Sequence, residues 1–131
     1  MAGETVADMG PGLLALVGVA EGDGPEQAIA LARKLVHLRI FEDAEGRMNC
    51  GLLDTEGTLG IVSQFTLLAD TSRGRRPFFG AAADPAIAEP LVEAVVAAAQ
   101  REGASVVTGQ FGAKMQLELA NEGPVTLLVE T

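Results

Sequence analysis

The alternation of apolar and polar positions along the chain predicts short strands and two amphipathic helices. A continuous apolar run at residues 13–20 has the length of a strand and predicts one that is buried on both faces. Apolar residues then recur every three or four positions from Pro25 to Leu38, which predicts a helix that begins at a proline. A second helix is predicted from Pro85 to about Arg101, where Pro90 favours a kink or a late start and Gly103 favours a C-terminal stop.

Six further segments have the length and composition of strands, and most neighbours are joined by short turns. They are Arg39–Phe41, Met48–Leu53, Leu59–Leu68, Ser105–Phe111, Lys114–Leu119 and Val125–Glu130. The pattern predicts a single α/β domain over residues 1–131, with mixed, mainly antiparallel sheets covered by two helices.

The charge of the chain limits the kinds of partner that it can hold. Its formal net charge of −9 argues against a protein that grips long stretches of nucleic acid, because phosphate neutralisation needs a basic face. Contact with the end of an RNA is compatible with this charge. Arg73, Arg75 and Arg76 lie within four residues and Lys114 stands alone downstream, so a local basic patch on an acidic body stays open.

Side chains that usually carry catalysis are scarce. The single histidine, His37, is expected to be a surface imidazole near the end of the first helix, since no nucleophile is adjacent to it in sequence. Cys50 is the only cysteine, so it can form no intramolecular disulfide, and an inert buried thiol is expected. No cluster of His, Cys and Asp has ligand spacing and no phosphate-binding loop is present, so neither a metal nor a cofactor is expected.

The N-terminus and the longest apolar runs bear on localisation. No basic segment followed by an apolar stretch marks a signal peptide, and the runs at residues 12–20 and 60–69 are too short to cross a bilayer. We therefore expect a cytoplasmic protein with no membrane partner.

Two polar segments interrupt the apolar pattern. Ser63, Gln64 and Thr66 fall in a segment that is otherwise typical of a buried strand. They favour equally hydrogen bonding within a sheet and a polar pocket floor that binds a carbonyl or a ribose. Residues 121–124, Asn-Glu-Gly-Pro, are typical of a reverse turn, but a fixed cis bond before Pro124 would aim the adjacent carbonyls in one direction.

These two segments are similar to the paired signatures of a known family. Residues 63–67, Ser-Gln-Phe-Thr-Leu, and residues 121–126, Asn-Glu-Gly-Pro-Val-Thr, resemble those of the bacterial and eukaryotic D-aminoacyl-tRNA deacylases. Further blocks resemble the family in the same order, at residues 10–14, 38–43, 46–49, 73–77 and 111–115. The resemblance covers essentially the whole chain, and the ordered set is far more specific than any single motif.

The resemblance implies an activity, a fold and an assembly. The activity is hydrolysis of the ester that joins a D-amino acid, or glycine mischarged on tRNA-Ala, to the terminal ribose of tRNA. The implied fold has three layers, β/β/α, and the implied assembly is a homodimer. In such a dimer the Gly123-Pro124 peptide is cis and enters the active site of the other protomer. Its backbone carbonyls would face the amino group of the substrate, so that an L-side chain is excluded sterically.

The resemblance also assigns roles to the other residues of these motifs. The catalytic wall would consist of Ser63, Gln64, Phe65 and Thr66. Thr66 is either a nucleophile or a bystander, and the scarcity of His and Cys favours polarisation of the ester carbonyl by backbone N–H groups, with help from the ribose hydroxyl. Met115 and Asn121 would bind substrate, although strand packing explains Met115 equally well. The acceptor end of tRNA would be contacted by Arg73, Arg75, Arg76 and Lys114, for which solvation of an ordinary loop is the alternative.

One departure from the family pattern concerns the N-terminus. Family members begin with a strand of the type Val-Gln-Arg-Val, which precedes the segment matched by residues 2–4, and this sequence begins without it. Either the start site is misassigned or the chain is a shortened form, in which loss of the strand would expose a sheet edge and impair folding or dimerisation. Two alternatives to the enzyme therefore stay open, a catalytically impaired or structural relative and a homodimer that binds a small molecule.

Overall fold

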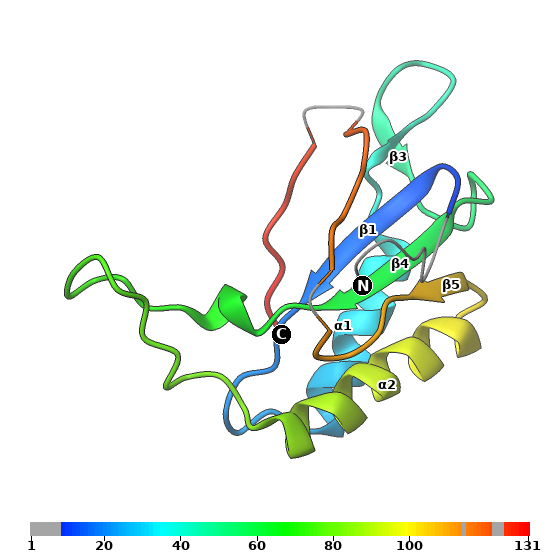
Figure 1. Cartoon of the computed structure of the whole chain (residues 1–131). Coiled ribbons are helices and arrows are strands. Elements are labelled where there is room, and N and C mark those ends of the chain that lie inside the picture. Colours follow the sequence, from blue (N-terminus) through cyan, green and yellow to red (C-terminus); the bar gives the residue numbers. More distant parts are fainter. Residues whose placement is uncertain (1–8, 114, 122–124) are drawn as a thin grey trace.

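A computed structural model describes residues 9–113, 115–121 and 125–131 of the chain (Figure 1). Its elements, in chain order, are β1 (Gly12–Val17), α1 (Pro25–His37), β2 (Phe41–Glu42), β3 (Met48–Cys50), β4 (Thr58–Ser63), the 3₁₀ helix η1 (Phe65–Leu68), α2 (Pro85–Arg101) and β5 (Ser105–Thr108). The two predicted helices are confirmed within one residue at each end, and the predicted α/β class is confirmed with them.

The larger sheet has three strands in the order β1–β4–β5, and both pairings are parallel. In the register of β1 and β4, Gly12 lies opposite Thr58 and Val17 lies opposite Ser63. A chain that leaves a strand, forms a helix and returns beside it enters the next strand in the same direction. Helix α1 lies in the first such connection and α2 in the second, so this sheet is parallel where mainly antiparallel sheets were expected.

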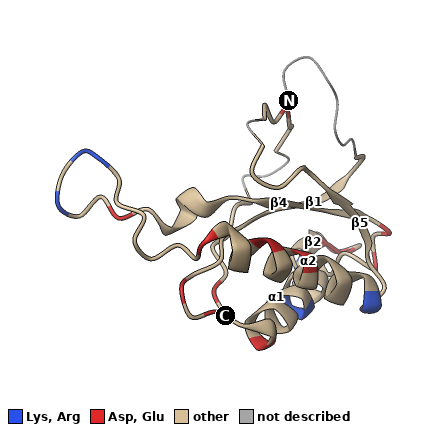
Figure 2. Ribbon diagram, turned by 60° about the horizontal axis from the view of Figure 1, so that its bottom comes forward, with Lys and Arg blue, Asp and Glu red and all other residues tan. Residues whose placement is uncertain are grey.

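Both helices lie on one face of this sheet and pack against each other (Figure 2). The core lies between them and the strands, where Val36, Leu59 and Ile61 are almost wholly buried. Ala32 of α1 and Ala99 of α2 are fully buried too, and such small side chains let the helices approach closely. The face of the sheet that the helices cover is therefore buried in the core.

The opposite face of the sheet carries exposed apolar side chains. Alternate residues of a strand point to opposite faces, and in β1 Ala15 and Val17 are buried while Leu14 and Leu16 are 36% and 42% exposed. The prediction of a strand buried on both faces was therefore wrong, because the helices cover only one of them.

Several predicted strands are shorter than expected or do not form. The strand predicted at residues 59–68 ends at Ser63, because the chain turns at Gln64 and then forms η1. The described residues of the strands predicted at 114–119 and 125–130 lie outside strands. Figure 1 shows both as extended segments. Alternation predicts an extended chain, but a strand also needs a hydrogen-bonded neighbour, which these residues lack within the described part of the chain.

The boundaries of the second helix were anticipated more closely. Helix α2 begins at Pro85 and continues through Pro90, so the late start did not occur. After the C-cap Glu102, Gly103 adopts a φ of 102°, the left-handed conformation expected of a glycine that ends a helix. No described helix is long and apolar enough to cross a membrane.

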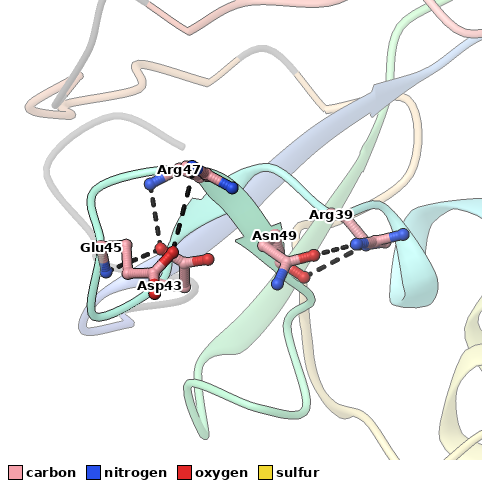
Figure 3. Close-up of polar contacts among 5 residues, drawn as sticks. All are labelled: Arg39, Asp43, Glu45, Arg47 and Asn49. Carbon is pink, nitrogen blue, oxygen red and sulfur yellow. Dashed lines mark hydrogen bonds and ion pairs between the residues drawn. The ribbon is translucent and has the colours of Figure 1, made fainter.

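Strands β2 and β3 form a separate antiparallel hairpin whose turn is organised by polar contacts (Figure 3). The carboxylate of Asp43 accepts hydrogen bonds from the backbone amides of Glu45 and Arg47, at 2.9 and 3.0 Å. At the base of the hairpin, Arg39 donates to the backbone carbonyl of Asn49 at 3.2 Å and to its side-chain oxygen. These contacts shape the turn and tie β3 to the segment that follows α1.

Candidate functional site

The first polar segment forms a turn at the carboxyl end of β4. Ser63 is the last residue of the strand, and the backbone amide of Gln64 donates to the carbonyl of Val17 at 2.8 Å. Gln64 then has φ −144° and ψ 85°, which turns the chain out of the sheet before η1 begins at Phe65. Because β1 and β4 are parallel, their carboxyl ends meet at the same edge, and the turn is anchored to both strands there.

Side-chain and backbone hydrogen bonds brace the turn from within. The side-chain amide of Gln64 donates to the hydroxyl oxygen of Thr66. The backbone amide of Leu67 donates to the carbonyl of Gln64 at 3.2 Å, and that of Ala69 donates to the carbonyl of Thr66 at 3.1 Å. Within the described residues, no carboxylate, imidazole or amine hydrogen-bonds to the Thr66 hydroxyl, which is therefore placed by a neutral amide.

The turn also presents backbone donors that have no acceptor among the residues that the structure describes. Phe65 and Thr66 are the first two residues of η1, so their amides have no acceptor within the helix. No carbonyl or side chain elsewhere in the described residues accepts from them. Such amides can bind the oxygen of a polarised carbonyl group without any cost of breaking an internal hydrogen bond.

An aromatic contact joins the turn to a residue that the sequence did not single out. The rings of Phe65 and Phe79 meet edge to face, with centroids 5.1 Å apart and an angle of 61° between planes. The side chain of Phe65 is otherwise 56% exposed. The chain has only five phenylalanines and no tryptophan or tyrosine, and two of the five stand together at positions 78 and 79. Two adjacent phenylalanines in a chain with few aromatic residues were the one feature of the sequence that could have pointed to Phe79.

Gly18 is a second residue that the sequence did not single out. A Cβ atom at this position would lie 2.5 Å from Cδ2 of Leu68 and 3.3 Å from the carbonyl oxygen of Gln64. The absence of a side chain at Gly18 therefore lets η1 settle against the end of β1.

Met115 lies near the same edge of the sheet. A Cβ atom built on Gly109 would be 3.4 Å from the sulfur of Met115 and 3.7 Å from Cγ2 of Val62. The amide of Gly109 donates to the carbonyl of Ile61 at 3.4 Å, so these residues border the carboxyl end of β4. This position is compatible with a pocket wall and with simple packing, the two interpretations that the sequence left open.

Only one end of the second polar segment is described. The side-chain amide of Asn121 donates to the hydroxyl of Thr126 at 3.3 Å, and both side chains are exposed. Gly123 and Pro124 lie outside the described residues, as does Lys114. The structure thus describes Ser63, Gln64, Phe65 and Thr66 as one turn, places Met115 beside the strand that leads into it, and leaves the Gly-Pro peptide undescribed.

Residues 69–84 form a long loop, which we call the arm, that projects from the body of the molecule (Figures 1 and 2). Figure 2 shows basic residues at its far end, where Arg73, Arg75 and Arg76 are all exposed. Within the arm, the backbones of Asp70 and Phe78 exchange two hydrogen bonds of 2.7 and 2.9 Å. The side chain and backbone of Ser72 also donate to the Asp70 carboxylate and hold the pKa of that carboxyl below its ordinary value of 3.8.

His37 and Cys50 do not take part in the turn. The imidazole of His37 is 55% exposed and pairs with the carboxylate of Glu102 at 2.8 Å, linking the ends of α1 and α2. The expected surface imidazole is confirmed. Cys50 is a half-buried free thiol in β3. No three side chains of the His, Cys, Asp and Glu types gather to hold a metal ion within the described ranges.

The parallel sheet and the turn at its edge define an α/β protein whose candidate site is built from backbone amides and uncharged polar side chains. A family model described as "D-Tyr-tRNA(Tyr) deacylase" matches residues 1–130. The chain belongs to that family.

Individual relatives agree with the family match. The D-aminoacyl-tRNA deacylase of Dehalococcoides mccartyi is 51% identical over 131 residues, which span 100% of this chain and 86% of the relative. That of Chloroflexus aurantiacus is 53% identical over 131 residues, spanning 100% of this chain and 82% of the relative.

Solved structures share the fold. A structure titled "c-Myc DNA Unwinding Element Binding Protein" has a TM-score of 0.88 and 30% identity, and the match covers 95% of this chain and 85% of that one. A structure titled as a probable eukaryotic D-amino acid tRNA deacylase has a TM-score of 0.62 and 19% identity, covering 86% and 80%, and this likeness concerns the fold alone.

Proposed function

We propose that the chain hydrolyses the ester bond of D-aminoacyl-tRNA, releasing free tRNA and the D-amino acid, and so proofreads the chirality of amino acids in translation. The observation that carries this proposal is the family match over residues 1–130. Relatives named D-aminoacyl-tRNA deacylase are also about half identical to this chain over its whole length. Glycine mischarged on tRNA-Ala is a second substrate under the proposal, since a glycyl ester has no side chain to exclude.

In the proposed reaction, water adds to the ester carbonyl carbon and the bond from that carbon to the ribose oxygen breaks. The proton of the attacking water passes to the leaving ribose oxygen. The amides of Phe65 and Thr66 stabilise the negative charge that develops on the carbonyl oxygen, and the neighbouring ribose hydroxyl assists the proton transfer. Since no base within the described residues contacts the Thr66 hydroxyl, Thr66 positions the turn and is not the nucleophile.

Selection between D- and L-amino acids is proposed to come from Gly123 and Pro124 of a partner protomer. Their backbone carbonyls would receive the amino group of the substrate and leave no room for an L-side chain. The hydrogen bond between Asn121 and Thr126 supports this role, because it joins described residues on either side of the peptide in sequence.

Exposed apolar side chains support the homodimer that this arrangement requires. Leu14 and Leu16 lie on the face of the sheet without helices, and Phe65 and Leu67 lie on η1 beside it. Further exposed leucines lie on the two extended C-terminal segments, at positions 117, 119, 127 and 128. Exposed apolar side chains that form a contiguous patch are typical of a protein interface.

The arm is proposed to contact phosphates at the acceptor end of tRNA. The chain as a whole has a net charge of −9 and so repels RNA, whereas Arg73, Arg75 and Arg76 hold three exposed positive charges on a projecting loop. This distribution favours contact with one end of the tRNA over contact along its length.

The proposal is tested with D-tyrosyl-tRNA as the substrate and the purified chain at a small fraction of the substrate concentration. We expect many turnovers for each protein molecule, and little hydrolysis of D-tyrosine ethyl ester, which lacks the tRNA. A folded chain that leaves D-tyrosyl-tRNA intact would contradict the proposal and favour an impaired relative. Equal hydrolysis of both esters would instead favour a site for small molecules.

A further inference from the structure

We propose that Phe79 is a positioning residue for the reaction, which holds the Ser63–Thr66 turn through its edge contact with Phe65 and so couples the arm to the site. This inference rests on the proposed function, because it assigns that turn a part in ester hydrolysis. It adds a residue from outside both signature motifs.

The two adjacent phenylalanines of the arm have different surroundings. Phe79 is half-buried and its ring meets that of Phe65 at 5.1 Å, whereas Phe78 is 68% exposed. Within the described residues this is the single aromatic pair. Edge-to-face packing fixes the relative orientation of two rings more strictly than contact between aliphatic side chains.

The backbone on both sides of Phe79 is fastened. On one side, Phe78 exchanges hydrogen bonds of 2.7 and 2.9 Å with Asp70. On the other side, the carbonyl of Ala81 accepts from the amide of Glu21 at 2.8 Å, and the amide of Ala83 donates to the carbonyl of Val19 at 2.9 Å. The backbone of Phe79 is thus held by hydrogen bonds on both sides. Its ring is therefore well placed to restrain the ring of Phe65.

Phe65 depends on that support. It is the first residue of η1 and is more than half exposed, so few other side chains restrain its ring. The backbone amides of Phe65 and Thr66 are the donors assigned to the ester carbonyl. If the Phe65 residue shifted, with its backbone, both amides would be displaced. Removing the ring of Phe79 should therefore impair alignment at the reacting carbonyl while leaving the arginines of the arm in place.

The experiment compares Phe79→Leu with the matched control Phe78→Leu, each measured on D-tyrosyl-tRNA. We expect Phe79→Leu to lower kcat by about three- to tenfold with KM changed by less than about twofold, since ring contacts of this kind are worth such factors. Phe78→Leu should stay within about twofold of the unaltered protein, and Phe79→Tyr, which keeps the ring, should restore kcat.

A second measurement does not depend on activity. Hydrogen exchange of the Leu67 and Ala69 amides, which close the turn, should be faster in Phe79→Leu than in Phe78→Leu, while the two variants unfold at similar temperatures. Equal kcat and equal exchange in both variants would overturn the positioning role. If the unaltered chain does not hydrolyse D-tyrosyl-tRNA, the proposed function fails, and the exchange rates still decide whether Phe79 holds the turn.

Discussion

At the scale of single residues, the side chain of Thr66 separates two accounts of the chemistry. Its hydroxyl oxygen accepts a hydrogen bond from the side-chain amide of Gln64, an uncharged group that cannot remove a proton. A nucleophilic hydroxyl needs a base within hydrogen-bonding reach. The contacts of Thr66 therefore favour a mechanism in which backbone amides carry the catalysis.

The substitution Thr66→Ala tests this interpretation. We expect the variant to keep hydrolysing D-tyrosyl-tRNA at a rate within about tenfold of the unaltered protein, because the backbone amides of the turn remain. Single-turnover rates measure this directly, and Thr66→Ser, which keeps a hydroxyl, is the matched control. A fall of Thr66→Ala to the rate of spontaneous hydrolysis, with Thr66→Ser still active, would identify the hydroxyl as the nucleophile.

The residues of the site differ in how far the sequence could anticipate them. Ser63, Gln64, Phe65 and Thr66 form a contiguous motif, so the sequence alone groups them. Phe79 and Gly18 reach the turn only through the fold. Phe79 contacts Phe65, fourteen positions away in sequence, and Gly18 lies so close to Leu68 that an added Cβ atom would be 2.5 Å from its side chain. Neither contact leaves a periodic pattern in the sequence.

At the scale of elements, the two helices were predictable and the sheets only in part. Helical periodicity depends on residues within the same segment, which is why α1 was predicted from Pro25 onwards. Pairing direction depends on how distant segments meet, so alternation could not distinguish the parallel pairing of β1 and β4 from an antiparallel one. For the same reason, alternation at residues 125–130 did not reveal that no strand partner is present among the described residues.

The contacts of Asp43 predict that the stability of the turn between β2 and β3 depends on pH. Hydrogen bonds from the backbone amides of Arg47 and Glu45 hold the pKa of the Asp43 carboxyl below its ordinary value of 3.8. A carboxyl with a lowered pKa in the folded state stabilises the turn above 3.8, and this stabilisation is lost as the pH falls through the lowered pKa.

We therefore expect the amides of Glu45 and Arg47 to shift in NMR spectra during acidification, with a midpoint below 3.8. In Asp43→Asn, the side-chain oxygen still accepts hydrogen bonds but does not titrate, so the same amides should show no such transition. A midpoint at or above 3.8, or an unchanged transition in Asp43→Asn, would show that this carboxylate does not organise the turn.

The proposed role of the arm predicts how KM for tRNA depends on salt concentration. If Arg75 contacts a tRNA phosphate, Arg75→Ala should raise KM for D-tyrosyl-tRNA and make its dependence on salt less steep, by roughly 0.7–0.9 in the logarithmic slope. Arg47→Ala is the matched control, because Arg47 is an exposed arginine of the hairpin, outside the arm. Equal salt slopes for the two variants would show that Arg75 does not contact a tRNA phosphate.

At the scale of the whole molecule, the chain combines an acidic overall charge, a basic arm and a sheet face that carries exposed leucines on β1. The net charge of −9 on the whole chain would limit the proposed RNA contact to the projecting arm, and the edge contact of Phe79 with Phe65 joins the arm to the turn at the edge of the sheet. The exposed apolar side chains on the sheet face opposite the helices match the proposed homodimer, in which the Gly123-Pro124 peptide of one protomer would reach the turn of the other. Recognition of chirality would then depend on assembly, whereas the proposed polarisation of the ester carbonyl would depend on a turn within one chain.

We propose that this site distinguishes the two configurations of the amino acid by excluding the L-side chain. The most direct measurement compares single-turnover hydrolysis of D-tyrosyl-tRNA and L-tyrosyl-tRNA, prepared on the same tRNA and treated with an excess of the purified chain. We predict that the D-ester is hydrolysed at least about a hundredfold faster, since steric exclusion of a whole side chain discriminates strongly. Equal rates for the two esters would contradict the account.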